Sequence, residues 1–148
     1  MKKNLLVFAV VLFVFCLGAC SSGPASQEDI NNAFERIYSK YRADLSLDGA
    51  EEFTIVSGDT LSRLSINRWG SGNGFYFPVI MMASRDVVAD PDFIQPGMKV
   101  TIPNLQKNLD DAKARSRIKA FLKEISDVYK KKGDEGVQNE LIKLSNSL

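Results

Sequence analysis

Two turn-rich phrases, FTIVSGDTLSRLS and DPDFIQPGMKVTIP, enclose the segment from Phe53 to Pro103. The first phrase begins with the β-branched and aromatic residues of 53–56, which favour a strand, and residues 57–59 supply the Ser, Gly and Asp that end it. The second phrase carries a comparable strand signal over 100–102, closed by the proline. The two expected strands limit how the residues between them can fold.

Helical signals occupy the space between these strands. Asp59 or Thr60 can accept hydrogen bonds from the first free amides of a helix, which the pattern ends near Trp69. Pro78 suits the first position of a second helix, and the Gly-rich residues 70–74 predict a flexible hinge before it. The predicted order is strand, helix, helix, strand.

Arranged in this way, residues 52–104 resemble the lysin motif, or LysM, family of carbohydrate-binding modules. The resemblance implies an α+β fold in which a two-stranded antiparallel sheet carries two helices on one face. It also implies binding to the N-acetylglucosamine units of peptidoglycan or chitin. The most specific matches are Ser57, Gly58, Asp59, Thr60 and Leu61, then Ile94, Pro96, Gly97, Val100, Ile102 and Pro103, with Trp69 and Gly70 where the family commonly has an aromatic residue before Gly.

The resemblance further implies where a glycan would bind. In the family, the sugar lies in a shallow groove between the loop after the first strand and the loop before the second. An N-acetyl sugar offers an amide to the backbone and a methyl group to an apolar recess such as Leu61 with Ile94. Each residue also has a structural interpretation, because Asp59 and Thr60 can cap a helix and the two apolar residues can belong to the core. The expected ligand-binding residues are Gly58, Asp59, Thr60, Leu61, Pro91, Asp92, Phe93 and Ile94.

Two positions depart from the family pattern. Ser84 stands where the family commonly has Asn, and Met98 stands where the family usually has a Gln after Pro96 and Gly97. The polar contacts or loop-fixing hydrogen bonds of those amides are therefore expected to be lost. The aromatic run 75–77 can either stack on sugar rings or pack beneath the second helix, and packing is the favoured interpretation.

The N-terminus indicates a secretory leader. A basic start precedes the apolar residues 5–17, which are too few to span a bilayer because a spanning helix needs about 20. Residues 1–19 resemble the signal of bacterial lipoproteins, which implies cleavage before Cys20 and a lipid on its thiol. Residues 20–27 would then be the lipidated cysteine and a short tether. A plain secretory leader that happens to contain Cys20 is the alternative.

The residue after Cys20 bears on location. In enteric bacteria an Asp at this position tends to retain lipoproteins in the inner membrane, and this chain has Ser21 instead. The periplasmic face of the outer membrane is therefore favoured. Two or more acyl chains make a durable anchor, since each buried methylene contributes about 0.8 kcal/mol.

Composition argues against several classes of function. The chain has no His, and its two cysteines are Cys16 of the leader and Cys20, so thiol or histidine nucleophiles and His-containing zinc sites are not expected. A carboxylate pair from Glu51, Glu52 or Asp59 stays formally possible, but nothing in the spacing marks one. We therefore predict no enzymatic activity, metal or cofactor. With 19 Lys and Arg against 18 Asp and Glu, there is no basic stripe for nucleic acid.

Amphipathic helices are expected on both sides of this segment. Residues 28–47 contain an N-terminal helix that Ser26 can cap, and residues 105–148 form a helical hairpin. The cations 130–132 suit the end of its long helix, with Gly133 as the stop. We expect these helices to pack on one another and on the central segment. Recruitment of another envelope protein, or formation of a homodimer, is the alternative use of their apolar faces.

The sequence therefore predicts a lipid-anchored protein of the bacterial envelope that binds peptidoglycan without catalysis through one LysM segment. The alternative is a structural or adaptor lipoprotein in which this segment and its flanking helices bind a protein partner. Substitution of Asp59 or Ile94 separates the two, because it removes wall binding only in the first case.

Overall fold

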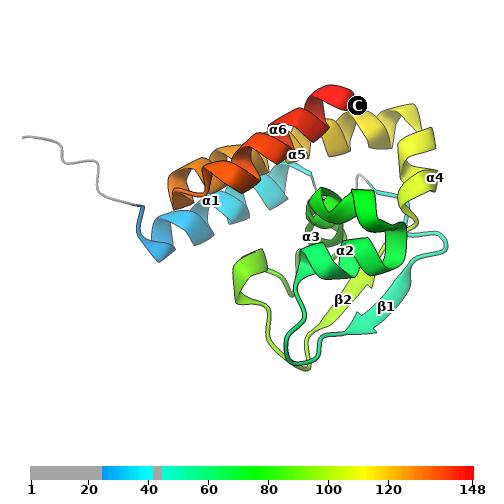
Figure 1. The fold of residues 1–148 in the computed structure, drawn as a ribbon, viewed down its shortest axis with the longest axis horizontal. Coiled ribbons are helices and arrows are strands. Elements are labelled where there is room, and N and C mark those ends of the chain that lie inside the picture. Colours follow the sequence, from blue (N-terminus) through cyan, green and yellow to red (C-terminus); the bar gives the residue numbers. More distant parts are fainter. Residues whose placement is uncertain (1–24, 42–44) are drawn as a thin grey trace, which may run out of the picture.

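The structure, a computed structural model, describes residues 25–41 and 45–148 (Figure 1). This part of the chain contains six α-helices, two 3₁₀ helices and one two-stranded antiparallel sheet, so the predicted α+β class is confirmed. The elements are α1 (Gln27–Lys40), β1 (Glu51–Thr54), α2 (Leu61–Trp69), η1 (Ser71–Tyr76), α3 (Phe77–Ala83), η2 (Pro91–Phe93), β2 (Lys99–Ile102), α4 (Leu105–Asp110), α5 (Ala112–Lys132) and α6 (Glu135–Ser147).

The first strand begins two residues earlier than predicted. The sequence pattern placed it at 53–56, whereas β1 spans Glu51–Thr54 and pairs antiparallel with β2. β1 also ends two residues earlier than predicted, because the Val56 amide donates to the Asp59 carboxylate at 2.9 Å in the turn and not to the ladder. Ile55 stays attached to the sheet edge through its amide, which donates to the Met98 carbonyl at 2.8 Å.

The helices between the strands begin and end close to their predicted positions. Thr60 is the N-cap of α2, and its hydroxyl accepts from the Arg63 amide at 3.1 Å. Gly70 follows the last residue of α2 with a φ of 99°, a conformation that favours glycine. Pro78 lies in the first turn of α3, one residue after the first position that the sequence predicted for it. Residues 71–76, where a Gly-rich hinge was expected, form the 3₁₀ helix η1 with a kink at Asn73.

The N-terminal helix begins where predicted and ends sooner. Ser26 caps α1 through a reciprocal capping box with Asp29. The predicted helix ran through 28–47, but α1 ends at Lys40 and Leu45 lies in a bend; residues 42–44 are outside the described part. The leader 1–19 and Cys20 also lie outside it.

The predicted hairpin 105–148 has an additional break. Asp111 ends α4 and caps α5, since its carboxylate accepts from the Ala114 amide at 2.8 Å. Gly133 ends α5 in the left-handed conformation, as predicted, and α6 returns along it. Figure 1 shows α1, α5 and α6 together on one side of the molecule and the two-stranded sheet on the other. Helices α1, α3, α4 and α6 all contact α5.

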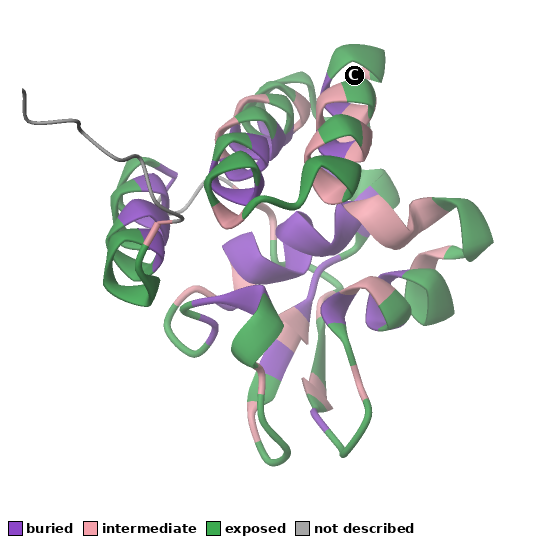
Figure 2. Cartoon of the chain, turned by 60° about the vertical axis from the view of Figure 1, so that its left-hand side comes forward, coloured by how far each residue is buried: buried purple, intermediate pink, exposed green. Residues whose placement is uncertain are grey.

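One hydrophobic core joins the helices to the sheet. Phe34 of α1, Phe121 of α5, Ile80 of α3 and Val100 of β2 belong to the same buried cluster. In Figure 2, buried positions concentrate at the centre of the molecule, where α3 is buried along most of its length. The expected packing of the flanking helices on the central segment is therefore confirmed. None of the helices described combines the length and apolarity that crossing a bilayer requires.

Candidate functional site

The two loops that were expected to bind a ligand meet in the structure. They enclose a pocket of about 240 Å³ between the first turn of α2 and the 3₁₀ helix η2, which we call the loop groove. Six of the eight predicted residues line it, together with three that the sequence did not indicate. The lining residues are Asp59, Thr60, Leu61, Ser62, Phe77, Pro91, Asp92, Ile94 and Tyr129.

The other two predicted residues do not line the loop groove. Gly58 has a φ of 88° in the turn before α2, where its carbonyl accepts from the Arg63 guanidinium at 3.2 Å. Its role is therefore to shape the turn. Phe93 is 59% exposed and borders a neighbouring hollow beside Val88 and Met98. Both residues were expected in the groove and lie beside it.

The α2 side of the loop groove combines a fixed turn with free backbone donors. Either Asp59 or Thr60 was expected to cap α2. Thr60 makes the cap, and the Asp59 carboxylate instead accepts from the Val56 amide and fixes the turn before the helix. Leu61 is 2% exposed and belongs to the core. The amides of Leu61 and Ser62 precede the first intrahelical hydrogen bond of α2, so the helix itself supplies no acceptor for them.

The opposite side is held by a buried charge cluster. Asp90 is buried, and its carboxylate accepts from the Asp92 amide at 3.0 Å, which caps η2. The Lys132 ammonium of α5 lies 2.6 Å from an oxygen of Asp90 and 2.6 Å from an oxygen of Asp92. Gln27 of α1 donates to the remaining Asp90 oxygen at 3.1 Å. Both flanking helices thus fix the position of η2.

Tyr129 of α5 forms a third side of the loop groove. Its hydroxyl donates to the Asp92 carboxylate at 3.2 Å, and its ring meets Phe77 edge to face with 5.9 Å between centroids. The Lys132 ammonium lies 5.2 Å from the centre of the same ring. In the sequence, Tyr129 was one residue of an apolar helical stripe and Lys132 one of three cations at a helix end. Neither pattern connects them to a loop about 40 residues earlier.

The position of Tyr129 predicts a loss of stability at alkaline pH. Burial, and then the negative charges of Asp92 and Asp90, raise the pKa of this phenol above its usual value of 10.0. Above pH 10 the phenol of the unfolded chain loses its proton while the phenol of the folded chain keeps it. The free energy of unfolding is therefore unaffected by this group below pH 10 and falls as the pH rises above 10. The slope from one such group is at most about 1.4 kcal/mol per pH unit. We expect Tyr129→Phe to flatten the fall of unfolding free energy measured by urea titration on both sides of pH 10. Parallel curves for the two proteins would contradict this.

Position 84 retains a loop-fixing role despite its small side chain. The Ser84 hydroxyl accepts from the Thr101 amide at 2.8 Å and donates to the Thr101 carbonyl at 3.3 Å, which ties the end of α3 to β2. The expected loss of anchoring at this position is therefore wrong. Tyr76 and Phe77 are buried and Phe75 is half-buried, which confirms packing for this aromatic run.

The carboxylates near the loop groove are engaged in hydrogen bonds that hold the fold. Asp59 binds the turn, and Asp92 binds both Tyr129 and Lys132. Glu51 and Glu52 form exposed ion pairs on the sheet with Arg68 and Lys99 at 2.9 and 3.0 Å. The loop groove therefore offers fixed acceptors, backbone donors and one half-buried apolar side chain, Ile94. This is a set of groups suited to holding a polar ligand with a small apolar substituent.

Comparisons of this chain with protein-family models, with curated proteins and with solved structures each found no match.

Proposed function

We propose that this chain is an envelope protein of the lysin-motif type that binds N-acetylglucosamine-containing glycan, such as peptidoglycan, without catalysis in the loop groove. The observation that supports this most directly is the meeting of the two loops. Their phrases begin and end the segment 53–103, and residues of both, including Thr60 and Ile94, line one pocket. The antiparallel pairing of β1 with β2 brings them together.

The chemistry of the loop groove suits an N-acetyl sugar. The free first-turn amides of Leu61 and Ser62 can donate to the acetamido carbonyl oxygen. Ile94 is half-buried and can cover the acetyl methyl group, while the fixed carboxylate of Asp92 can accept from a sugar hydroxyl. A pocket of about 240 Å³ is shallow and small, which fits a site that holds one or two sugar units weakly.

The inward packing of the flanking helices supports glycan binding over an adaptor role. Buried residues of α1, α5 and α6 such as Phe34, Phe121 and Leu141 lie in the common core, so these faces are already covered by the chain itself. The same helices hold η2 through Lys132 and Gln27. They therefore act on the shape of the loop groove.

We further propose that a lipid on Cys20 anchors the chain, with the periplasmic face of the outer membrane as the favoured location. A tether of this kind raises the effective concentration of a weak site at the wall. Replacing Cys20 with Ser is expected to move the protein from the membrane fraction to the soluble fraction of lysed cells, because the acyl chains have no attachment point. Membrane association that survives the substitution would contradict the proposed anchor.

The loop groove is tested by co-sedimentation of the full chain with purified peptidoglycan, in a detergent without a sugar headgroup. Ile94→Asp replaces the half-buried apolar side chain with a charge, and we expect the affinity to fall about tenfold or more, a loss of at least about 1.4 kcal/mol. Val87→Asp is the matched control, because Val87 is 44% exposed and does not line the loop groove.

Circular dichroism of both variants verifies the fold. If Ile94→Asp protein pellets as well as the unchanged chain, or if the unchanged chain does not pellet, the proposed binding is wrong. Release of soluble muropeptides from the wall during incubation would contradict the non-catalytic role.

A further inference from the structure

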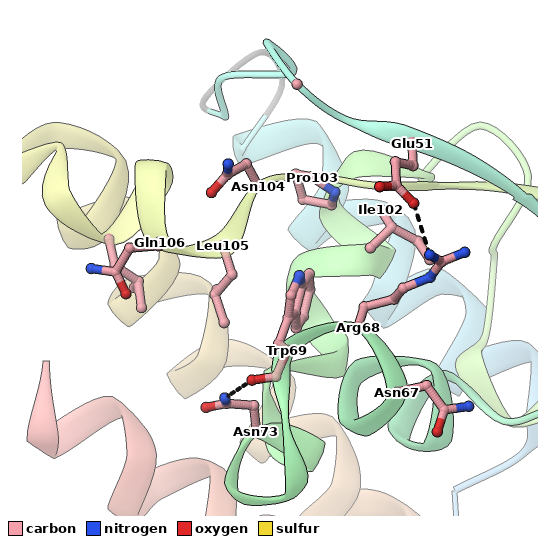
Figure 3. A pocket seen from close by; sticks show the side chains of 12 residues that line it. Glu51, Asn67, Arg68, Trp69, Asn73, Ile102, Pro103, Asn104, Leu105 and Gln106 are labelled. Carbon is pink, nitrogen blue, oxygen red and sulfur yellow. Dashed lines mark hydrogen bonds and ion pairs between the residues drawn. The ribbon is translucent and has the colours of Figure 1, made fainter.

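A second and larger pocket lies at the opposite end of α2 from the loop groove. Its volume is about 470 Å³, and it opens between the last turn of α2, the start of β1 and the chain that leads from β2 into α4. We call it the Trp69 pocket (Figure 3). Its lining residues are Gly49, Glu51, Asn67, Arg68, Trp69, Asn73, Ile102, Pro103, Asn104, Leu105, Gln106 and Leu109.

The centre of this pocket is the only tryptophan of the chain. Trp69 is half-buried, and Figure 3 shows its indole standing in the pocket with Leu105 on one side and Arg68 on the other. Its backbone carbonyl accepts from the Asn73 side chain, which fixes η1 against the end of α2. Among the described residues the indole N–H has no hydrogen-bond acceptor, and it is not fully buried. The indole therefore presents both an apolar face and an N–H donor to the Trp69 pocket.

The rim of the Trp69 pocket carries balanced charge. Glu51 and Arg68 form an ion pair at 2.9 Å, and the guanidinium also lies 5.6 Å from the centre of the Phe53 ring. The remaining polar side chains of the pocket are uncharged amides, those of Asn67, Asn73, Asn104 and Gln106. An anionic or cationic ligand would find no uncompensated opposite charge here.

An uncharged ligand with many hydroxyl groups and an apolar face fits this combination. The axial C–H groups of a sugar ring can lie on the negative face of an indole, and its hydroxyls can bond to amides, to an ion pair and to a free N–H. We propose that the Trp69 pocket is an oligosaccharide-binding site separate from the loop groove. The two sites lie at opposite ends of α2, a helix of 9 residues that is about 13 Å long. The inference does not require that the loop groove binds glycan.

The single tryptophan makes the test direct, because its indole N–H gives one resonance that reports on this pocket. The full chain, labelled with ¹⁵N and kept in a detergent without a sugar headgroup, is titrated with chitotetraose and with cellotetraose to about 10 mM, enough to detect millimolar affinity. We expect one of these probes to shift the indole resonance in the unchanged chain. We expect the same shift in Ile94→Asp, whose substitution lies in the loop groove.

A second variant tests the ring itself. Trp69→Phe keeps an aromatic side chain but removes the N–H donor and part of the stacking surface, so the affinity measured by calorimetry in the Ile94→Asp background should fall about fivefold or more. The proposal is overturned if neither probe moves the indole resonance, if the shift disappears in Ile94→Asp, or if Trp69→Phe binds as well as its parent. A failure of the proposed glycan binding in the loop groove would be recognised separately, because Ile94→Asp protein would then pellet with peptidoglycan as well as the unchanged chain does.

Discussion

Replacing Lys132 with Met should lower the free energy of unfolding by about 3 to 5 kcal/mol, because it removes the partner of a buried carboxylate. The Lys132 side chain is 13% exposed and that of Asp90 only 3% exposed. The ammonium lies 2.6 Å from carboxylate oxygens of both Asp90 and Asp92 and also contacts the rings of Phe34 and Tyr129. Methionine can fill much of the same volume, so the loss reports the uncompensated charge more than a cavity.

The same substitution should weaken the proposed glycan binding. Among the described residues, removal of the ammonium leaves Asp92 with one side-chain partner, the hydroxyl of Tyr129, and leaves Asp90 with one, Gln27. The 3₁₀ helix η2 then loses its strongest link to α5, and Ile94, which follows it, is less well placed. The fraction of Lys132→Met protein that pellets with peptidoglycan should therefore be lower than that of the unchanged chain, at a temperature where the variant is still folded.

Urea unfolding followed by circular dichroism measures the first effect. Lys131→Met is the matched control, because the neighbouring lysine is exposed on the same helix and removing its charge should change stability by no more than about 0.5 kcal/mol. Equal stabilities for the two variants would show that the buried ion pair contributes nothing to the fold. A loss confined to glycan binding would show that the cluster positions η2 without stabilising the protein.

Local chemistry explains which parts of the fold could be predicted. Thr60, Gly70 and Gly133 each begin or end a helix through bonds or backbone angles within a few residues. The sequence predicted the ends at Gly70 and Gly133 and offered Thr60 as one of two candidate caps. The two loops that line the loop groove were also identified, since turn residues mark them directly. Their meeting follows from the antiparallel pairing of two short strands.

The remaining features depend on contacts between residues far apart in the sequence. Tyr129 and Lys132 lie on a helical stripe whose period predicts burial but does not identify the partner. Their contact with Asp92 exists only because α5 packs on α3 and carries both side chains to η2. The early end of β1 arises from the Asp59 side chain, which competes with the ladder for the Val56 amide. The alternation of apolar and polar residues in a sequence does not show which hydrogen bond a single amide will make.

Asn108 gives the second large effect that we expect. It is fully buried in α4, and its side-chain oxygen accepts from the Ser46 amide at 2.8 Å. Its amide nitrogen donates to the carbonyls of Ser46 at 3.0 Å and Asn104 at 2.9 Å. The two hydrogen bonds with Ser46 thus join α4 to the segment that leads into β1. In the sequence, nothing around this residue indicates such a role.

Asn108→Ala should lower the free energy of unfolding by about 2 to 4 kcal/mol, because alanine leaves both backbone groups of Ser46 without their partner in a half-buried position. Gln106→Ala on the same helix is the matched control, since Gln106 is exposed and, within the part of the chain that the structure describes, its side chain bonds only to Asp110 one turn later. Amide hydrogen exchange separates the local effect from the global one: Ser46 should lose protection before the amides of α5 do. If the Ser46 amide exchanges as slowly in Asn108→Ala as in the unchanged chain, the segment is held by packing, and the entry of β1 into the sheet does not depend on the Asn108 side chain.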